Sequence, residues 1–156
     1  MNHPVLCLAY KITNGKHSVV YTGDNEPYNF YHIYSPITRR SIQGDINKED
    51  QNHYAEELLK FLDSTDMLFA DTQYTDEEYK AKIGWGHSPL SYVLDITKKS
   101  KVKHLVMFHH EPTRSDKELD EMLAKAKSLI SSNGHSLQIS LAREGTTLSI
   151  VSIQPL

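Results

Sequence analysis

Short apolar stretches with the length of β-strands recur along the chain. Near the N-terminus, Val5 to Thr13 and His17 to Thr22 lie on either side of Asn14-Gly15, a dipeptide typical of a tight hairpin turn. We expect these two stretches to pair as strands. Four further stretches combine strand length with apolar or β-branched residues: Met67 to Ala70, Val102 to Phe108, Leu137 to Leu141 and Thr146 to Val151.

Other segments repeat apolar residues every three or four positions, as the buried face of an α-helix does. The clearest stripe runs from Leu119 to Ile130 and follows Ser115 and Glu118, which have the spacing of a capping box. Ser88 and Pro89 fit the cap and the first position of another helix. The predicted helices cover Gln51 to Ser64, Thr75 to about Lys82, Ser88 to about Ile96 and Ser115 to Ile130.

The order of these elements predicts the fold class. Residues Glu26 to Asp50 are polar and rich in tyrosine without a clear period, which indicates a long loop. Elsewhere strands alternate with helices, a pattern typical of a layered α/β domain, here with antiparallel strand pairs at both ends. The 156 residues suit one domain, residues 1–156, that is long enough to bury a core.

The composition excludes several classes of protein. A net charge of -3 gives no general attraction to nucleic acid or to an anionic membrane. No apolar run reaches the length of a transmembrane helix, and the N-terminus lacks the pattern of a signal peptide. The single cysteine, Cys7, excludes an internal disulfide framework. We therefore expect a cytoplasmic protein with no membrane partner.

The candidate chemistry lies where predicted strands end. Asp24, Asp71 and the pair His109-His110 each lie at the end of a predicted strand. Adjacent residues on a strand point to opposite faces, so at most one of the two histidines aims at a given centre. Imidazole nitrogens and carboxylate oxygens are ligands that zinc takes. We therefore predict that these strand ends converge at one edge of the sheet and form a metal or catalytic site.

Together these segments resemble the C-terminal half of metallo-β-lactamase-fold hydrolases, especially the branch near RNase Z and the cyclic phosphodiesterases. The match runs from His3 to about Asp116, and the order of its motifs is more specific than any one of them. Three motifs resemble the family's third, fourth and fifth metal motifs, and a two-part segment resembles an acidic-plus-His-Ser feature of this branch. The three metal motifs are Asn2-His3-Pro4 before the strand with Leu8-Ala9-Tyr10-Lys11, Val20-Tyr-Thr-Gly-Asp24 and Leu105-Val-Met-Phe-His109. The two-part segment is Ala70-Asp-Thr-Gln-Tyr74 with Gly84-Trp-Gly-His-Ser88.

The resemblance implies a set of metal ligands. His3, Asp24 and His109 would bind zinc, with manganese or iron as alternative metals. In the family the ligand directly follows the strand, which favours His109, and His110 is the alternate. A carboxylate in the position of Asp24 can bridge two metal ions.

It also implies a fold and an activity. The expected fold is α/β, half of a four-layer αββα sandwich with a mixed sheet and helices on one face. Asp71 would orient His87, and His87 would donate a proton to the leaving oxygen. The implied function is a metal-dependent hydrolase that uses metal-activated water on a phosphodiester or a related ester. A small-molecule or phosphodiester substrate is favoured over nucleic acid.

One family feature is absent. The His-x-His-x-Asp-His motif, which lies on the family's N-terminal half and supplies most ligands of the first metal, is not in the sequence. The sequence therefore predicts an incomplete hydrolase whose inner sheet face is an exposed apolar surface, and a complementing N-terminal half or self-association would cover it. Two other readings stay open: a catalytically silent fragment or interaction module that needs a partner half, and a monomeric small-molecule-binding domain.

Overall fold

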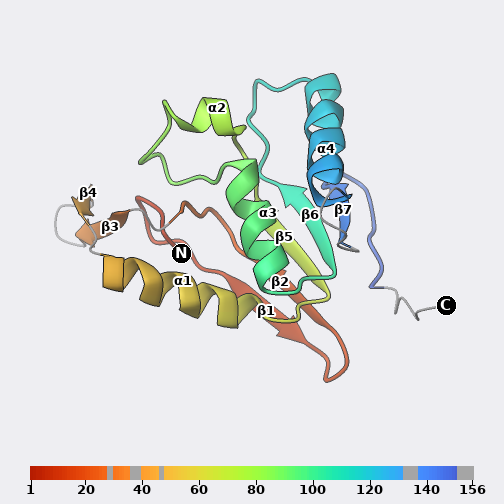
Figure 1. The fold of residues 1–156 in the computed structure, drawn as a ribbon, viewed down its shortest axis with the longest axis horizontal. Coiled ribbons are helices and arrows are strands. Elements are labelled where there is room, and N and C mark those ends of the chain that lie inside the picture. Colours follow the sequence, from red (N-terminus) through yellow and green to blue (C-terminus); the bar gives the residue numbers. More distant parts are fainter. Residues whose placement is uncertain (28–29, 36–39, 46–47, 132–136, 151–156) are drawn as a thin grey trace.

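The computed structural model describes residues 1–27, 30–35, 40–45, 48–131 and 137–150. Its centre is a mixed five-stranded sheet in the order β1-β2-β5-β6-β7 (Figure 1). β1 runs antiparallel to β2, and β2, β5, β6 and β7 run parallel to one another. The strands are β1 (Tyr10–Thr13), β2 (Ser18–Tyr21), β5 (Met67–Asp71), β6 (His104–Phe108) and β7 (Gln138–Leu141).

The predicted N-terminal hairpin is present, and its turn residues explain its shape. The side-chain oxygen of Asn14 accepts hydrogen bonds from the backbone N–H groups of Lys16, at 3.1 Å, and His17, at 2.8 Å. Gly15 has a φ of 83°, a left-handed conformation that glycine adopts at little cost. The turn therefore sets the β1–β2 register, in which Thr13 lies opposite Ser18.

Within the described ranges, four helices connect or flank the strands: α1 (Lys48–Leu62), α2 (Asp76–Tyr79), α3 (Leu90–Lys99) and α4 (Asp116–Ser131). The capping box predicted at Ser115 is formed, because Ser115 N–H donates to the Glu118 carboxylate and Glu118 N–H donates to the Ser115 hydroxyl. The cap predicted at Ser88 is wrong. Pro89 occupies the cap of α3, and the Ser88 hydroxyl instead donates to the Asn25 carbonyl.

The core lies between the sheet and the helices. Alternate residues of the parallel strands, such as Leu68 and Leu105, are fully buried and pack in one cluster with residues of α1, α3 and α4. This alternation is the period of a β-strand, so one face of the sheet supplies the strand side of that core. The helix side includes Leu62, Val93 and Met122. The expectation of a mixed sheet with helices on one face is therefore confirmed (Figure 1).

The opposite face of the sheet is covered in one part and exposed in another. Leu148 and Ile150 line a pocket with Val19, Met67 and Phe69 of that face. Residues 146–150 form no strand, so the predicted closing strand is wrong over this range, and Val151 lies outside the described residues. The apolar side chains that suggested a strand line this pocket instead.

The exposed part of this face belongs to the hairpin and the segment before it. Ile12 is 70% exposed and Tyr10 is 55% exposed, and Tyr10 lies opposite Tyr21 in the register. Leu8, two residues before Tyr10, is 56% exposed. We call Leu8, Tyr10, Ile12 and Tyr21 the apolar row. An exposed apolar row of this kind is typical of a surface that another chain or domain covers.

Two further expectations are wrong. The segment predicted as a long loop contains a two-stranded antiparallel hairpin, β3 (Phe30–Ser35) with β4 (Arg40–Asp45). Its first strand holds aromatic and β-branched residues, and their strand propensity outweighs the missing alternation. The antiparallel pair expected between Leu137–Leu141 and Thr146–Val151 is not formed over the described residues, because 146–150 are not a strand; β7 instead pairs in parallel with β6, and α4 carries the chain back between them. In the described parts of the chain, no helix combines the length and the apolar character needed to cross a bilayer.

Replacing Leu105 by alanine should lower the free energy of unfolding by about 2–5 kcal/mol, since it leaves a cavity between sheet and helices. Ile12→Ala, at the exposed row, should change it by less than about 0.5 kcal/mol. Urea denaturation of both variants measures the difference. If Ile12→Ala lowers the free energy of unfolding as much as Leu105→Ala does, the apolar row is buried in solution.

Candidate metal centre

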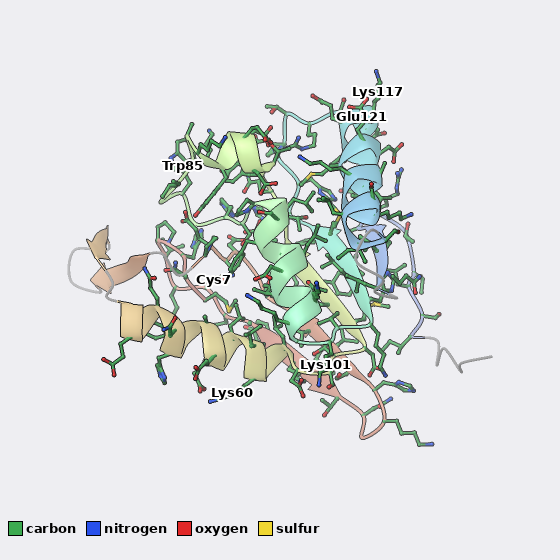
Figure 2. All side chains as sticks on the ribbon, viewed as in Figure 1. Cys7, Lys60, Trp85, Lys101, Lys117 and Glu121 are labelled. Atoms are coloured by element: carbon green, nitrogen blue, oxygen red, sulfur yellow. The ribbon has the colours of Figure 1, made fainter. Side chains whose placement is uncertain are left out.

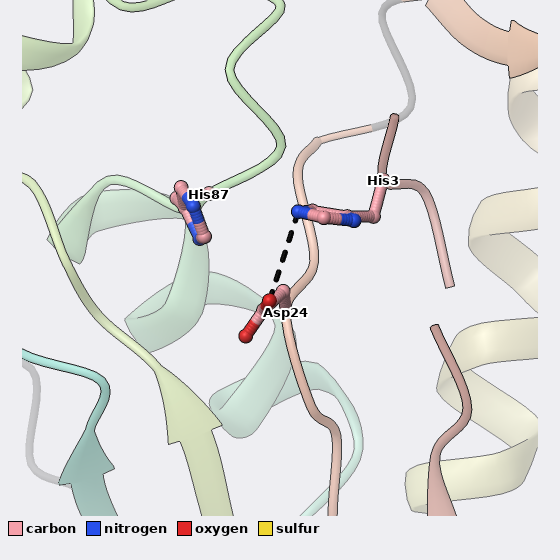
Figure 3. A group of neighbouring side chains, drawn as sticks. All are labelled: His3, Asp24 and His87. Carbon is pink, nitrogen blue, oxygen red and sulfur yellow. Dashed lines mark ion pairs between the residues drawn. The ribbon is translucent and has the colours of Figure 1, made fainter. Parts of the chain in front are cut away.

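Three strand ends converge as the sequence predicts. Parallel pairing aligns β2 with β5 and β5 with β6, so the residues that follow these strands lie at the same edge of the sheet. Asp24 comes shortly after β2, Asp71 ends β5, and His109 directly follows β6. His3, from the N-terminal segment, and His87, from the loop before α3, lie at the same edge (Figure 3).

Asp24 lies between two imidazole rings. Its Oδ2 is 3.6 Å from His3 Nε2, and its Oδ1 is 3.3 Å from His109 Nδ1. The Asp24 side chain is partly exposed, so a solvent-borne ion can reach it. Among the described residues Asp24 pairs with His109 rather than with His110. His110 is partly buried, and burial lowers its pKa.

His87 is held by a buried carboxylate. Its Nδ1 lies 2.9 Å from Asp71 Oδ2, and the Asp71 side chain is 1% exposed. Asp71 also accepts hydrogen bonds from the backbone N–H groups of Asn25 and Gln73. The Asp71 carboxylate therefore forms hydrogen bonds both with the surrounding backbone and with the imidazole, and it fixes the orientation of the His87 ring.

The pKa of His87 is raised above its ordinary value. Burial is the largest single influence on this pKa and acts to lower it. The hydrogen bond to Asp71 and the charges of Asp71, Asp24 and Glu26 act in the opposite direction and together outweigh burial. The His87 ring also stacks on His109, with centroids 4.8 Å apart and planes 16° from parallel.

His3, Asp24 and His87 together could hold a metal ion. One ligand atom from each residue lies within 4.8 Å of the others (Figure 3). Two imidazoles and a carboxylate are a donor set that zinc accepts, and three protein ligands leave a position for water. The resemblance implied His109 as the second imidazole ligand and His87 as a proton donor. The geometry groups His87 with the candidate ligands, and the ligand role of His109 stays a prediction.

Comparisons with known proteins show how this arrangement relates to known folds. No family model matches the sequence. Alpha-1,2-mannosyltransferase MNN26 of Candida albicans is 31% identical over 81 residues, which are 49% of this chain and 11% of that protein. The chain thus spans only a small part of this curated relative.

Two solved structures match nearly the whole chain. The metallo-beta-lactamase fold protein YhfI from Bacillus subtilis matches with a TM-score of 0.60 and 21% identity, over 93% of this chain and 45% of that one. This chain has part of the metallo-β-lactamase fold. Human tRNase Z, short form, matches with a TM-score of 0.52 and 14% identity, over 92% of this chain and 38% of that one. The chain spans less than half the length of these solved structures.

Within this metallo-β-lactamase fold, His109 has an unusual backbone conformation. Its φ is 55°, a left-handed value that is rare for a residue other than glycine. The preceding strand end is fixed, since the N–H and the hydroxyl of Thr72 both donate to the Phe108 carbonyl.

Sequence reasoning missed one buried residue beside the site, Glu26. Its carboxylate accepts hydrogen bonds from the backbone N–H groups of Gly84 and Gly86, in the loop that leads to His87. The loop exposes Trp85 (Figure 2). Lys82 Nζ lies 3.7 Å from the centroid of its ring. The two glycines flanking Trp85 were a signal of close backbone approach, but nothing in the sequence paired them with Glu26.

Asp71→Asn should lower the pKa of His87, because it removes the carboxylate whose hydrogen bond and charge favour the protonated imidazole. The ring resonances of His87 in an NMR titration measure this pKa. Asp95→Asn is the matched control, since Asp95 is exposed and pairs with Lys99 on α3. An unchanged pKa in Asp71→Asn would contradict the charge effect assigned to Asp71.

His109→Gly should be more stable than His109→Ala by about 1 kcal/mol, since glycine adopts the left-handed backbone without strain. Chemical denaturation of the two variants measures the difference. Equal stabilities, or a more stable alanine variant, would mean that residue 109 does not hold this conformation in solution.

Proposed function

We propose that this chain supplies part of the active centre of a metal-dependent hydrolase that cleaves a phosphodiester or a related ester. The observation that carries the proposal is the convergence of His3, Asp24 and His87 at one sheet edge within part of a metallo-β-lactamase fold. A solved tRNase Z is among the proteins with a similar fold, which supports a phosphodiester as the substrate class.

The donor atoms support zinc first, with manganese or iron as alternatives. Asp24 offers one carboxylate oxygen toward His3 and the other toward His109, so it can bind a metal ion on either side. A bound divalent ion would supply Lewis acidity and a water of lowered pKa near the substrate.

The Asp71–His87 pair supports a second task. Because Nδ1 of His87 faces Asp71, Nε2 is the nitrogen that remains for a ligand or a substrate. The raised pKa keeps a larger fraction of His87 protonated near neutral pH than an ordinary imidazole would hold. We infer that His87 ligates the metal in the chain alone. In an assembled enzyme with further ligands, it would donate a proton to the leaving oxygen.

A complementing half is the proposed partner. The apolar row lies on the sheet face opposite the helices, and the chain spans 45% and 38% of the solved structures it matches. A second sheet packed on this face would bury the row and could bring the further ligands. Two copies of this chain are the alternative arrangement.

An interaction module without catalysis is the second candidate function. The exposure of Leu8, Tyr10 and Ile12 favours it, because this surface would bind a partner whether or not a metal occupies the site. Metal affinity separates the two candidates, since the module has no need of a metal.

Asp24→Asn should weaken zinc binding by at least about 10-fold, because it removes the carboxylate shared by the imidazoles. Isothermal calorimetry measures the affinity, and hydrolysis of bis(para-nitrophenyl) phosphate measures the activity of the zinc- and manganese-loaded chain, alone and with a complementing half. Asp95→Asn is again the control and should match the wild type.

Two results would reject the hydrolase. If the wild-type protein takes up neither zinc nor manganese, the interaction module remains as the proposed function. Equal zinc affinity in wild type and Asp24→Asn would mean that the ion binds elsewhere.

His87→Gln separates the two roles proposed for His87. A lower zinc affinity supports the ligand role, and unchanged affinity with lost hydrolysis supports the proton-donor role alone.

A further inference from the structure

Glu26 is a buried acidic residue to which the proposed function gives neither a ligand role nor a proton-transfer role. Its exposed fraction is 0%, although an unpaired buried carboxylate is costly. One carboxylate oxygen accepts hydrogen bonds from the Tyr79 hydroxyl at 2.9 Å and from Gly84 N–H at 2.7 Å. The other accepts from Gly86 N–H at 2.7 Å. These distances are in the range of charge-assisted hydrogen bonds, so Glu26 fixes the backbone of the loop on both sides of Trp85.

Gly86 brings this loop against the first candidate ligand. A Cβ atom at Gly86 would lie 2.2 Å from His3 Cδ2 and 2.5 Å from Pro4 Cδ. The φ of Gly86 is 95°, which side-chain-bearing residues rarely adopt. The backbone next to His87 is thus in direct contact with the His3 ring, and the position of the loop sets the position of both imidazoles relative to each other.

The segment that carries Glu26 also holds the N-terminal residues. Glu26 N–H donates to the Asn2 carbonyl at 2.9 Å, and the Asn2 side-chain amide donates to the Pro27 carbonyl at 3.1 Å. Asn25 accepts a hydrogen bond from Asn2 N–H at 3.2 Å. Residues 25–27 therefore hold the segment of His3 through the backbone and the loop of His87 through the Glu26 carboxylate.

We propose that Glu26 is a positioning residue: its carboxylate holds His3 and His87 at the separation that a metal ion requires. Its carboxylate acts through the Gly84 and Gly86 N–H groups, which belong to the loop that leads to His87. This inference rests on the metal site proposed above and adds a residue to it that neither binds the ion nor reacts.

Glu26→Gln tests the proposal with little change of volume. A glutamine has one acceptor oxygen and one amide donor, so one of the positions facing the Tyr79, Gly84 and Gly86 donors becomes a donor itself. Tyr79→Phe is a milder variant that removes one hydrogen bond and leaves both backbone contacts. Glu121→Gln is the matched control, since Glu121 lies exposed on α4 and pairs only weakly with Lys117 (Figure 2).

Four measurements are made on each variant. NMR hydrogen exchange of the Gly84 and Gly86 amides, in metal-free protein, reports the loop. Calorimetry gives the zinc affinity, and the visible spectrum of the cobalt(II)-loaded protein reports the ligand geometry. Denaturation midpoints show how much of any effect is a loss of global stability.

We expect Glu26→Gln to speed exchange at both glycines, to weaken zinc binding by about 10–100-fold and to change the cobalt spectrum. Tyr79→Phe should show smaller changes in the same direction, which keeps the test valid if Glu26→Gln does not fold. Glu121→Gln should match the wild type in all four measurements.

The proposal is overturned if Glu26→Gln keeps the zinc affinity and the cobalt spectrum of the wild type. It is also overturned if a lower denaturation midpoint explains the whole loss of zinc affinity. Failure of the proposed function gives a different result. If wild-type protein binds no zinc, the metal role of Glu26 fails together with the site, while the exchange data from metal-free protein still decide whether Glu26 positions the loop.

Discussion

Parallel pairing of β2, β5 and β6 is the constraint on which the candidate site depends. Each of these strands ends at the same edge, and the register places Tyr21 beside Phe69 and Asp71 beside Phe108. Strand pairing thereby brings Asp24, Asp71 and His109 together although they lie far apart in the sequence. Contacts between their own side chains are not needed for this. The core on the helical face stabilises this sheet, so the geometry of the edge depends on packing that lies well away from it.

The sequence was sufficient for those parts of the fold that depend on local pattern. The hairpin at Asn14-Gly15 and the capping box at Ser115 follow from short-range hydrogen bonds that the residue types alone specify. The convergence of Asp24, Asp71 and His109 was also predictable, because it depends only on strand ends and parallel direction. The hairpin β3–β4 was not, since a strand without alternation cannot be told from a loop by periodicity.

The finer geometry of the site depends on contacts that the sequence does not encode locally. His87 was expected beside Asp71 and is found there, but its closeness to His3 comes from the Gly86 backbone and the buried Glu26. Glu26 was read as the start of a polar loop, and its burial depends on three donors from a segment about sixty residues away. Hydrogen bonds between distant loops of this kind leave no periodic signal in the chain.

The apolar row has a consequence for the turnover of the protein in a cell. β1 is at the edge of the sheet among the described strands, and Lys11, the charged residue within it, points to the other side, where its ammonium donates to the Phe61 and Asp63 carbonyls. The row itself holds no charged residue, so its apolar surface is open to other chains unless a partner covers it. A copy whose face stays uncovered would be a substrate for chaperones and proteases. Selective degradation of such copies would match the abundance of this chain to that of whatever covers it.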